Sequence, residues 1–133
     1  MSVLPPRRPL VLVVEDDTDV RDSIEAALAW EGYATAAAPE GREALRLLER
    51  HPPPCLILLD LMMPVMNGRT FLAEMSRRPV LSSIPVVVLS ATAELEVARR
   101  TLPATAFLQK PVSLDTLLEV VARLCGPPDP EAS

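Results

Sequence analysis

The chain has 133 residues, of which 49% are hydrophobic and 23% charged, the size and balance of one globular domain with an ordinary hydrophobic core. Its formal net charge of −5 argues against a nucleic-acid-binding protein, because affinity for a phosphate backbone requires a basic face. No apolar stretch approaches the length of a membrane span, and the first residues lack the apolar core of a secretory signal. We therefore expect a cytoplasmic protein without membrane contact.

The two cysteines, Cys55 and Cys125, have neither the spacing of metal ligands nor the number that a disulfide framework requires. Cys55 opens an apolar run and Cys125 closes an apolar helical pattern. We interpret both as small buried hydrophobic residues in a reducing compartment.

Short apolar runs alternate along the chain with segments of helical periodicity. We predict five strands, in chain order at Leu10–Val14, Tyr33–Ala38 (a weaker one), Cys55–Leu59, Pro85–Leu89 and, as a short strand, around Thr105–Gln109. A helix should follow each strand: the first from Asp17 to Glu31, the second opening at Pro39 and Glu40, the third carrying Phe71, Leu72 and Met75, the fourth near Ala93–Leu102 and the last capped by Ser113. In the first of these helices we expect Val20, Ile24, Ala27 and Leu28 to face inward. Such units imply an α/β fold with a five-stranded parallel sheet and helices on both faces. We expect five helices and the flavodoxin-like strand order 2-1-3-4-5.

Both ends of the chain are rich in proline, and we do not expect them to pack. We predict a flexible leader at residues 1–8, one domain at residues 9–125 and a flexible tail at residues 126–133. No internal repeat or low-complexity segment lies between the two ends.

Polar side chains stand where the strong predicted strands end. Glu15, Asp16 and Asp17 follow the first strand, Asp60 ends the third, Ser90 ends the fourth, and Lys110 follows the fifth. Ligands of open α/β sheets bind beyond the carboxyl ends of the strands. These residues are therefore the candidate site.

The acidic residues among them predict a metal site. Capping of the next helix explains Asp17 and is an alternative explanation of Asp16, but it does not explain Asp60, which lies between apolar residues. A cluster of Glu15, Asp16 and Asp60 would take up protons or hold a counter-ion. Because the ligands are oxygen atoms with no His or Cys nearby, a hard divalent cation is favoured, and Mg²⁺ suits best.

Lys110 is the single lysine among 13 basic residues. Chance is the alternative explanation of its position. An ammonium group is a compact point charge, whereas a guanidinium is a wide planar fork. With a carboxylate, Mg²⁺ and the Ser90 hydroxyl nearby, the Lys110 ammonium group fits a phosphoryl transfer in which Asp60 attacks in line and becomes an aspartyl phosphate.

These residues together resemble the receiver (response-regulator) domain of two-component signalling, over roughly Leu10 to Leu124. The matching motifs are Val13-Val14-Glu15-Asp16-Asp17, Leu59 to Gly68, Val88-Leu89-Ser90-Ala91 and Lys110-Pro111. The resemblance implies that Asp60 accepts a phosphoryl group from a phosphohistidine of a histidine kinase or a histidine phosphotransfer protein. It also implies a Mg²⁺ site in which Glu15 and Asp16 form the acidic pair, with Asp16, Asp60 and the main-chain carbonyl of Met62 as the direct protein ligands.

The same resemblance implies a switch. Ser90 stands at the family's Thr or Ser position and Phe107 at its switch aromatic, so phosphorylation would alter a protein-interaction surface for an unknown downstream target. Plain core packing is the alternative explanation of Phe107. The Lys110-Pro111 bond corresponds to the family's cis peptide. The sequence leaves open whether the chain forms a homodimer.

We interpret the chain as a stand-alone, chemotaxis-regulator-like receiver domain, and not as an enzyme. The first alternative is a Mg²⁺-dependent phosphatase with an aspartate nucleophile, although such enzymes commonly carry a second Asp where this chain has Met62. The second is a flavin carrier, which Glu15, Asp16 and Asp17 disfavour because they would repel a phosphate group. The third is a receiver fragment of a hybrid kinase or a larger regulator.

Overall fold

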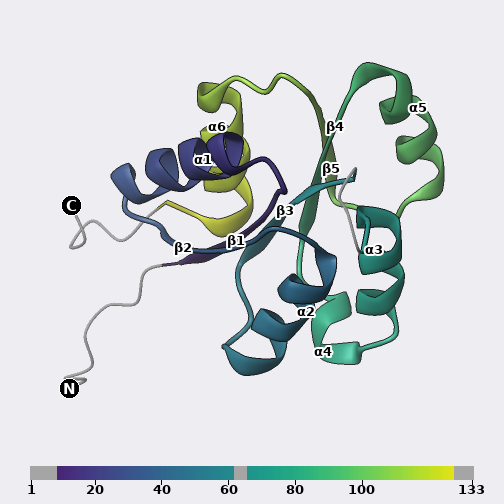
Figure 1. Ribbon diagram of the computed structural model, residues 1–133. Helices are drawn as coiled ribbons and strands as arrows, with labels where there is room; N and C mark the ends of the chain where they lie inside the picture. Colours follow the sequence, from purple (N-terminus) through teal and green to yellow (C-terminus); the bar gives the residue numbers. More distant parts are fainter. Residues whose placement is uncertain (1–8, 62–65, 128–133) are drawn as a thin grey trace.

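A computed structural model describes residues 9–61 and 66–127, and their five strands form one parallel sheet in the predicted order β2-β1-β3-β4-β5 (Figure 1). The elements in chain order are β1 (Leu10–Val14), α1 (Thr18–Trp30), β2 (Ala34–Ala38), α2 (Gly41–Arg50), β3 (Leu56–Asp60), α3 (Gly68–Ser76), α4 (Pro79–Ser82), β4 (Val86–Ser90), α5 (Thr92–Thr101), β5 (Ala106–Gln109) and α6 (Leu114–Cys125). The predicted α/β fold and strand order are confirmed.

Helices cover both faces of the sheet, which explains why the central strands are continuously apolar. Ile24 and Leu28 of α1 and Leu117 and Val121 of α6 pack in one core cluster. Buried side chains of α2, α3 and α4, together with Ala98 of α5, pack in the other cluster. Figure 1 shows α1 and α6 together on one side of the sheet and the other helices across it. Every residue of β3 and β4 is buried between these layers.

The structure contains one helix that the sequence pattern does not predict. The element α4 is a single turn of four residues that begins with a proline, too short to produce a visible helical period. Its Leu81 is buried in the core cluster under α2 and α3. One predicted core position is wrong, because Val20 of α1 is 37% exposed.

The prediction that the two cysteines are buried thiols is also wrong. Cys55 and Cys125 form a disulfide that joins the residue before β3 to the last residue of α6, and their Cα atoms are 5.3 Å apart. Both residues are only half-buried. The reason is topological: α6 runs back along the sheet after β5 and ends at the edge where β3 begins. The bond therefore closes a long loop, because the cysteines are 70 positions apart in the sequence.

The predicted leader, residues 1–8, lies outside the described residues, and so does the tail from residue 128 onward. The first residue of the predicted tail, Gly126, packs back on the domain. It has a φ of +80°, and its carbonyl accepts a hydrogen bond of 2.9 Å from the Tyr33 hydroxyl.

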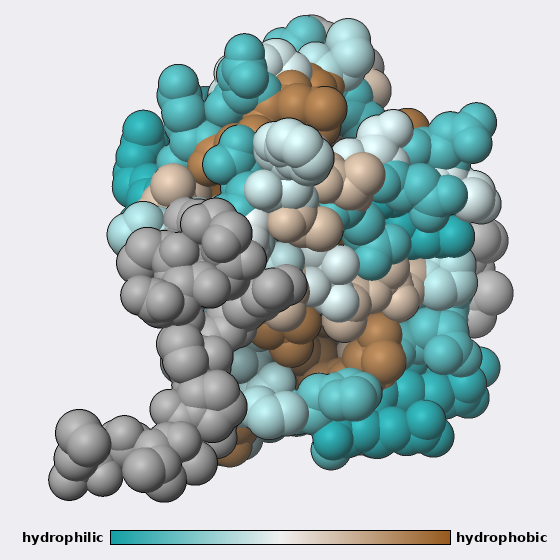
Figure 2. Space-filling view, turned by 90° about the vertical axis from the view of Figure 1, so that its left-hand side faces the viewer, coloured by the Kyte–Doolittle hydropathy of each residue, from teal (hydrophilic) through white to brown (hydrophobic). Residues whose placement is uncertain are grey.

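The surface next to α1 and the β2 edge is mixed in character. Figure 2 shows apolar patches on this side of the molecule, separated by hydrophilic side chains. The largest exposed apolar side chain is Trp30, the last residue of α1, which is 88% exposed. Among the helices of the described segments, none has both the length and the hydrophobicity of a membrane span.

Candidate functional site

The parallel sheet brings four of the predicted site residues to one edge. Glu15 follows β1, Asp60 and Ser90 end β3 and β4, and Lys110 follows β5. Since β1 lies between β2 and β3, the chain changes direction across the sheet there, and such a switch point is where α/β proteins bind ligands.

The Lys110 ammonium group joins two of the carboxylates. Its Nζ lies 2.8 Å from Glu15 Oε1, within hydrogen-bond distance, and 3.3 Å from Asp60 Oδ1. Glu15 and Asp60 are 1% and 4% exposed, so these carboxylates form a buried charged cluster with Lys110 at the end of the sheet. The predicted association of Lys110 with the acidic residues is present in the structure.

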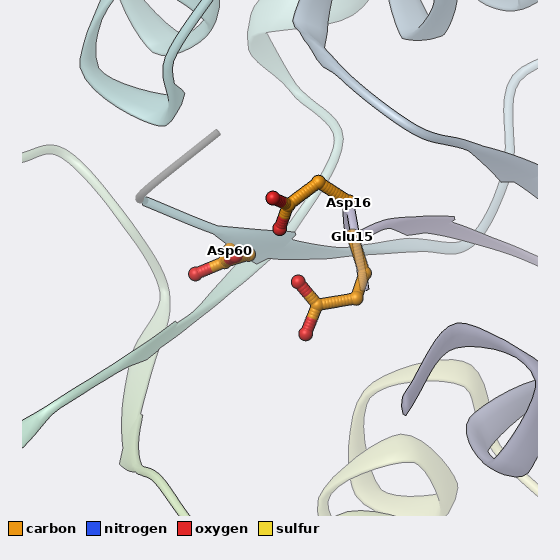
Figure 3. A group of neighbouring side chains, drawn as sticks. All are labelled: Glu15, Asp16 and Asp60. Carbon is orange, nitrogen blue, oxygen red and sulfur yellow. The ribbon is translucent and has the colours of Figure 1, made fainter. Parts of the chain in front are cut away.

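Three carboxylates gather at this edge. Glu15, Asp16 and Asp60 each offer one oxygen atom, and these atoms lie within 4.8 Å of one another (Figure 3). Asp16 is exposed, so the cluster opens to solvent on its side. Two carboxylates this far apart repel by roughly 3.5 kcal/mol at an effective dielectric constant of about 20. The cluster therefore needs positive charge or protons.

The pKa values of the buried groups reflect this demand. Burial raises the pKa of Glu15 above its ordinary value and the neighbouring Asp60 carboxyl group raises it further, although Lys110 acts in the opposite direction. For Lys110, burial by itself would lower the pKa. The hydrogen bond to Glu15 and the negative charge of Asp60 outweigh that effect, so the pKa of Lys110 is raised. Lys110 thus remains an ammonium ion beside Glu15, whose raised pKa makes its carboxyl group hold a proton more easily than an ordinary glutamate.

One oxygen atom of this cluster lacks a partner. Within the described segments, Glu15 Oε2 is the buried side-chain polar atom that makes no hydrogen bond. An unsatisfied buried oxygen is costly and calls for an explanation, such as a proton or a cation. With three carboxylates and no His or Cys ligand in the group, the residues fit a hard divalent cation such as Mg²⁺.

Local contacts hold the turn that presents the acidic residues. Asp17 caps α1, as predicted, by accepting hydrogen bonds from the backbone N–H groups of Asp19 and Val20 at 3.0 and 3.1 Å. Arg21 Nη1 donates to the backbone carbonyl of Glu15 at 2.8 Å. The contact made by Arg21 could not be predicted from the sequence, because an arginine in the first turns of a helix carries no signal of its own.

Ser90 and Phe107 lie on the same face of the sheet, under the helices α3 and α5. Phe107 pairs with Val88 across β4 and β5, and Ser90 stands two residues further along β4. Phe107 is half-buried and packs against the core cluster of that face. The Ser90 hydroxyl is 2% exposed and makes a long hydrogen bond of 3.4 Å to the Ala91 carbonyl. The predicted cis peptide between Lys110 and Pro111 is present.

The family model of the response regulator receiver domain matches residues 11–122. The chain belongs to this family. An uncharacterised 14.6 kDa protein of Leptolyngbya boryana is 36% identical over 123 residues, which cover 90% of this chain and 93% of that protein. The sensor histidine kinase TmoS of Ectopseudomonas mendocina is also 36% identical, but the match covers 88% of this chain and only 12% of the kinase. The matched region thus makes up nearly all of one short relative and a small part of a much longer one.

Solved receiver domains have the same fold. That of a signal transduction histidine kinase from Syntrophus aciditrophicus superposes with a TM-score of 0.81 at 31% identity, covering 88% of this chain and 89% of that one. That of a sensor histidine kinase from Pseudomonas aeruginosa PAO1 has a TM-score of 0.80 at 27% identity, covering 89% and 98%, and holds a magnesium ion in its active-site cleft. The present chain is therefore a receiver domain of two-component signalling.

In this receiver domain a glycine closes the loop after Asp60. Met62, predicted to offer its carbonyl as a metal ligand, lies outside the described residues. The Gly68 N–H donates a hydrogen bond of 3.0 Å to the Leu61 carbonyl. A Cβ atom on Gly68 would lie 2.8 Å from the Leu61 Cα and 2.9 Å from the Asp60 carbonyl oxygen. Only glycine allows this approach of two backbone segments.

Gly68→Ala should therefore lower the free energy of unfolding by about 1–3 kcal/mol, because the backbone next to Asp60 has to move. Urea unfolding followed by circular dichroism measures the change. Thr70→Ala, at an exposed position of the same helix, is the control, and we expect it to change stability by less than about 0.5 kcal/mol. Equal stability of the Gly68→Ala variant and the wild type would contradict the expected clash.

Proposed function

We propose that this receiver domain is a phosphorylation-driven switch in which Asp60 accepts a phosphoryl group. The donor would be a phosphohistidine of a partner histidine kinase or histidine phosphotransfer protein. The observation that carries the proposal is the position of the Lys110 ammonium group, 2.8 Å from Glu15 and 3.3 Å from Asp60 at the carboxyl edge of the sheet. A carboxylate nucleophile and a fixed positive charge at one open edge are what phosphoryl transfer requires.

In the proposed reaction an Asp60 carboxylate oxygen attacks the phosphorus atom in line as the bond to the donor nitrogen breaks. The donor imidazole leaves with the bonding electron pair, as a neutral ring when its other nitrogen carries a proton. The product on Asp60 is a mixed carboxylic–phosphoric anhydride. Lys110 neutralises charge on the phosphoryl oxygens throughout, and because its pKa is raised it remains protonated.

We further propose that Glu15, Asp16 and Asp60 hold Mg²⁺, with the Met62 carbonyl as an additional ligand. A bound Mg²⁺ would neutralise the charge of the incoming phosphoryl group. The close approach of the three carboxylates and the unpartnered Glu15 Oε2 support this assignment. Asp16 is the exposed member of the cluster, so the metal and the donor would reach the site from the side on which Asp16 lies.

The affinity for Mg²⁺ should fall as the pH is lowered from about 8 to about 5, because protons and the metal compete for the same carboxylates. The raised pKa of Glu15 moves this competition to a higher pH than an ordinary glutamate would give. Isothermal titration calorimetry at several pH values measures the effect. Glu15→Gln should weaken binding and flatten the pH dependence, whereas Asp115→Asn on the exposed face of α6 should change neither. An affinity that is independent of pH would count against a metal site that includes Glu15.

For the output we propose that Ser90 turns toward phosphorylated Asp60 and that Phe107 moves into the space it leaves. The movement would alter the surface of α5, β5 and α6, which a downstream protein then reads. The shared face of Ser90 and Phe107 supports this coupling, because the two side chains belong to one packed layer. We propose a cytoplasmic signalling domain without catalytic turnover and without nucleic-acid binding.

The deciding experiment is incubation of the protein with Mg²⁺ and acetyl phosphate, followed by mass spectrometry of the intact chain. We expect the wild type and Asp22→Asn, an exposed control in α1, to gain one phosphoryl group, and Asp60→Asn to gain none. No gain in the wild type, or an unchanged gain in Asp60→Asn, would reject the proposal. Steady release of phosphate from small phosphoesters would instead favour the phosphatase alternative.

A further inference from the structure

The disulfide lies at the edge of the sheet that is opposite to Asp60. It joins Cys55, which precedes β3, to Cys125, the last residue of α6. Asp60 ends the same strand, β3, at its other end. Both cysteines are only half-buried, so a small thiol can reach the bond without unfolding the domain.

The last turn of α6 has few other attachments. The fully buried residues of α6 are Leu117 and Val121, which lie before that turn. Ala122 and Arg123 are exposed, whereas Leu124 and Cys125 are half-buried and pack at the margin of the core cluster of α1 and α6. Beyond the disulfide, the long-range hydrogen bond found here is the one from Tyr33 to the Gly126 carbonyl. The disulfide is therefore a main tether of this end of the helix.

The other end of α6 begins next to the acidic edge. Ser113, three residues after Lys110, caps the helix. Its hydroxyl accepts a hydrogen bond of 3.2 Å from the Thr116 N–H. One helix thus runs from the neighbourhood of Lys110 to the disulfide. Its first turn lies beside the site that we propose for phosphorylation, and its last residue carries the disulfide to Cys55.

We propose that Cys55 and Cys125 are a reversible thiol–disulfide couple that reacts with thiol reductants and disulfide oxidants and so fixes or frees the last turn of α6. A domain with two large core clusters does not need a disulfide in order to fold, unlike small secreted scaffolds. In the cytoplasm that we propose for this receiver domain, persistent disulfides are rare and are mostly redox-active.

The thiol–disulfide exchange takes place in two steps. A thiolate of the reductant attacks one sulfur, which forms a mixed disulfide and releases the other cysteine as a thiolate that takes up a proton. A second reductant thiolate then displaces the remaining cysteine, and the reductant leaves as its own disulfide. The protein gains two electrons and two protons, and a disulfide oxidant reverses the sequence.

The test titrates the oxidised full-length chain in buffers of reduced and oxidised glutathione. Alkylation with mass spectrometry counts free thiols, and hydrogen exchange reports on residues 114–127. We expect both thiols to appear while the rest of the domain stays protected, with exchange in the last turn of α6 faster by about tenfold or more. Oxidised glutathione should restore the slow exchange.

Two variants sharpen this test. Cys125→Ser should show the fast exchange in every buffer. Tyr33→Phe, which removes the hydrogen bond to Gly126, should speed exchange in the reduced protein much more than in the oxidised one. Asp60→Asn should respond to glutathione like the wild type, so failure of the phosphorylation proposal leaves this result unaffected.

Either of two results would overturn the proposal. Thiols that appear only when the whole domain unfolds would make the disulfide a purely structural bond. Equal exchange of α6 in the oxidised and reduced wild type would show that the bond does not control the last turn.

Discussion

Lys110→Ala should slow the phosphorylation of Asp60 by acetyl phosphate about 10²–10³-fold, the usual effect of removing one charged or hydrogen-bonding group that stabilises a transition state. Lys110→Arg should also be slower than the wild type, because the wide guanidinium fork cannot take the place of a compact ammonium between two carboxylates. The ammonium lies 2.8 Å from Glu15 and 3.3 Å from Asp60, so little room remains for a larger group. The rate of phosphoryl gain, followed by intact mass, measures both effects.

The matched control is Arg50→Ala, which removes one positive charge from an exposed position at the end of α2. We expect its phosphorylation rate to equal that of the wild type. Circular dichroism should show that the Lys110→Arg variant remains folded. If Lys110→Arg is phosphorylated as fast as the wild type, then positive charge alone matters and the shape of the lysine does not.

Reduction of the disulfide should lower the free energy of unfolding by about 2–4 kcal/mol. The chain-entropy model gives about 4 kcal/mol for a loop closed by cysteines 70 residues apart, because the bond restricts the unfolded chain. Measured values tend to be smaller, since the unfolded chain retains some structure. Urea unfolding with and without dithiothreitol measures the difference.

The control for this experiment is the double variant Cys55→Ser/Cys125→Ser. Its unfolding midpoint should be the same with and without dithiothreitol and close to that of the reduced wild type. A wild-type midpoint that does not change on reduction would contradict the expected stabilisation.

Much of the sheet and of the acidic edge could be predicted from the sequence, for a physical reason. Strands that are buried on both faces are continuously apolar, and β3 and β4 are fully buried as their sequences indicate. A charged residue at the end of such a run, such as Asp60, stands out because burial there is costly. The parallel order then places Glu15, Asp60 and Lys110 at one edge, and the distances agree with that placement.

The features that were missed depend on contacts between distant parts of the chain. The sequence does not predict the bond between Cys55 and Cys125, because nothing near either cysteine in sequence reveals that α6 ends beside the start of β3. The role of Arg21 depends on the shape of the turn after β1. The exposure of Val20 has the same kind of cause: a helical period gives the direction of an apolar stripe but not how far a neighbouring helix covers it.

The disulfide also changes the covalent topology of the molecule. Residues 55–125 form a closed ring that contains Asp60, Ser90 and Lys110, whereas Glu15 and Asp16 lie on the open segment before it. A single cut inside the ring leaves all of these residues on one connected molecule. A cut at the exposed residues 51–53 instead divides the acidic cluster between two fragments that only the folded sheet holds together.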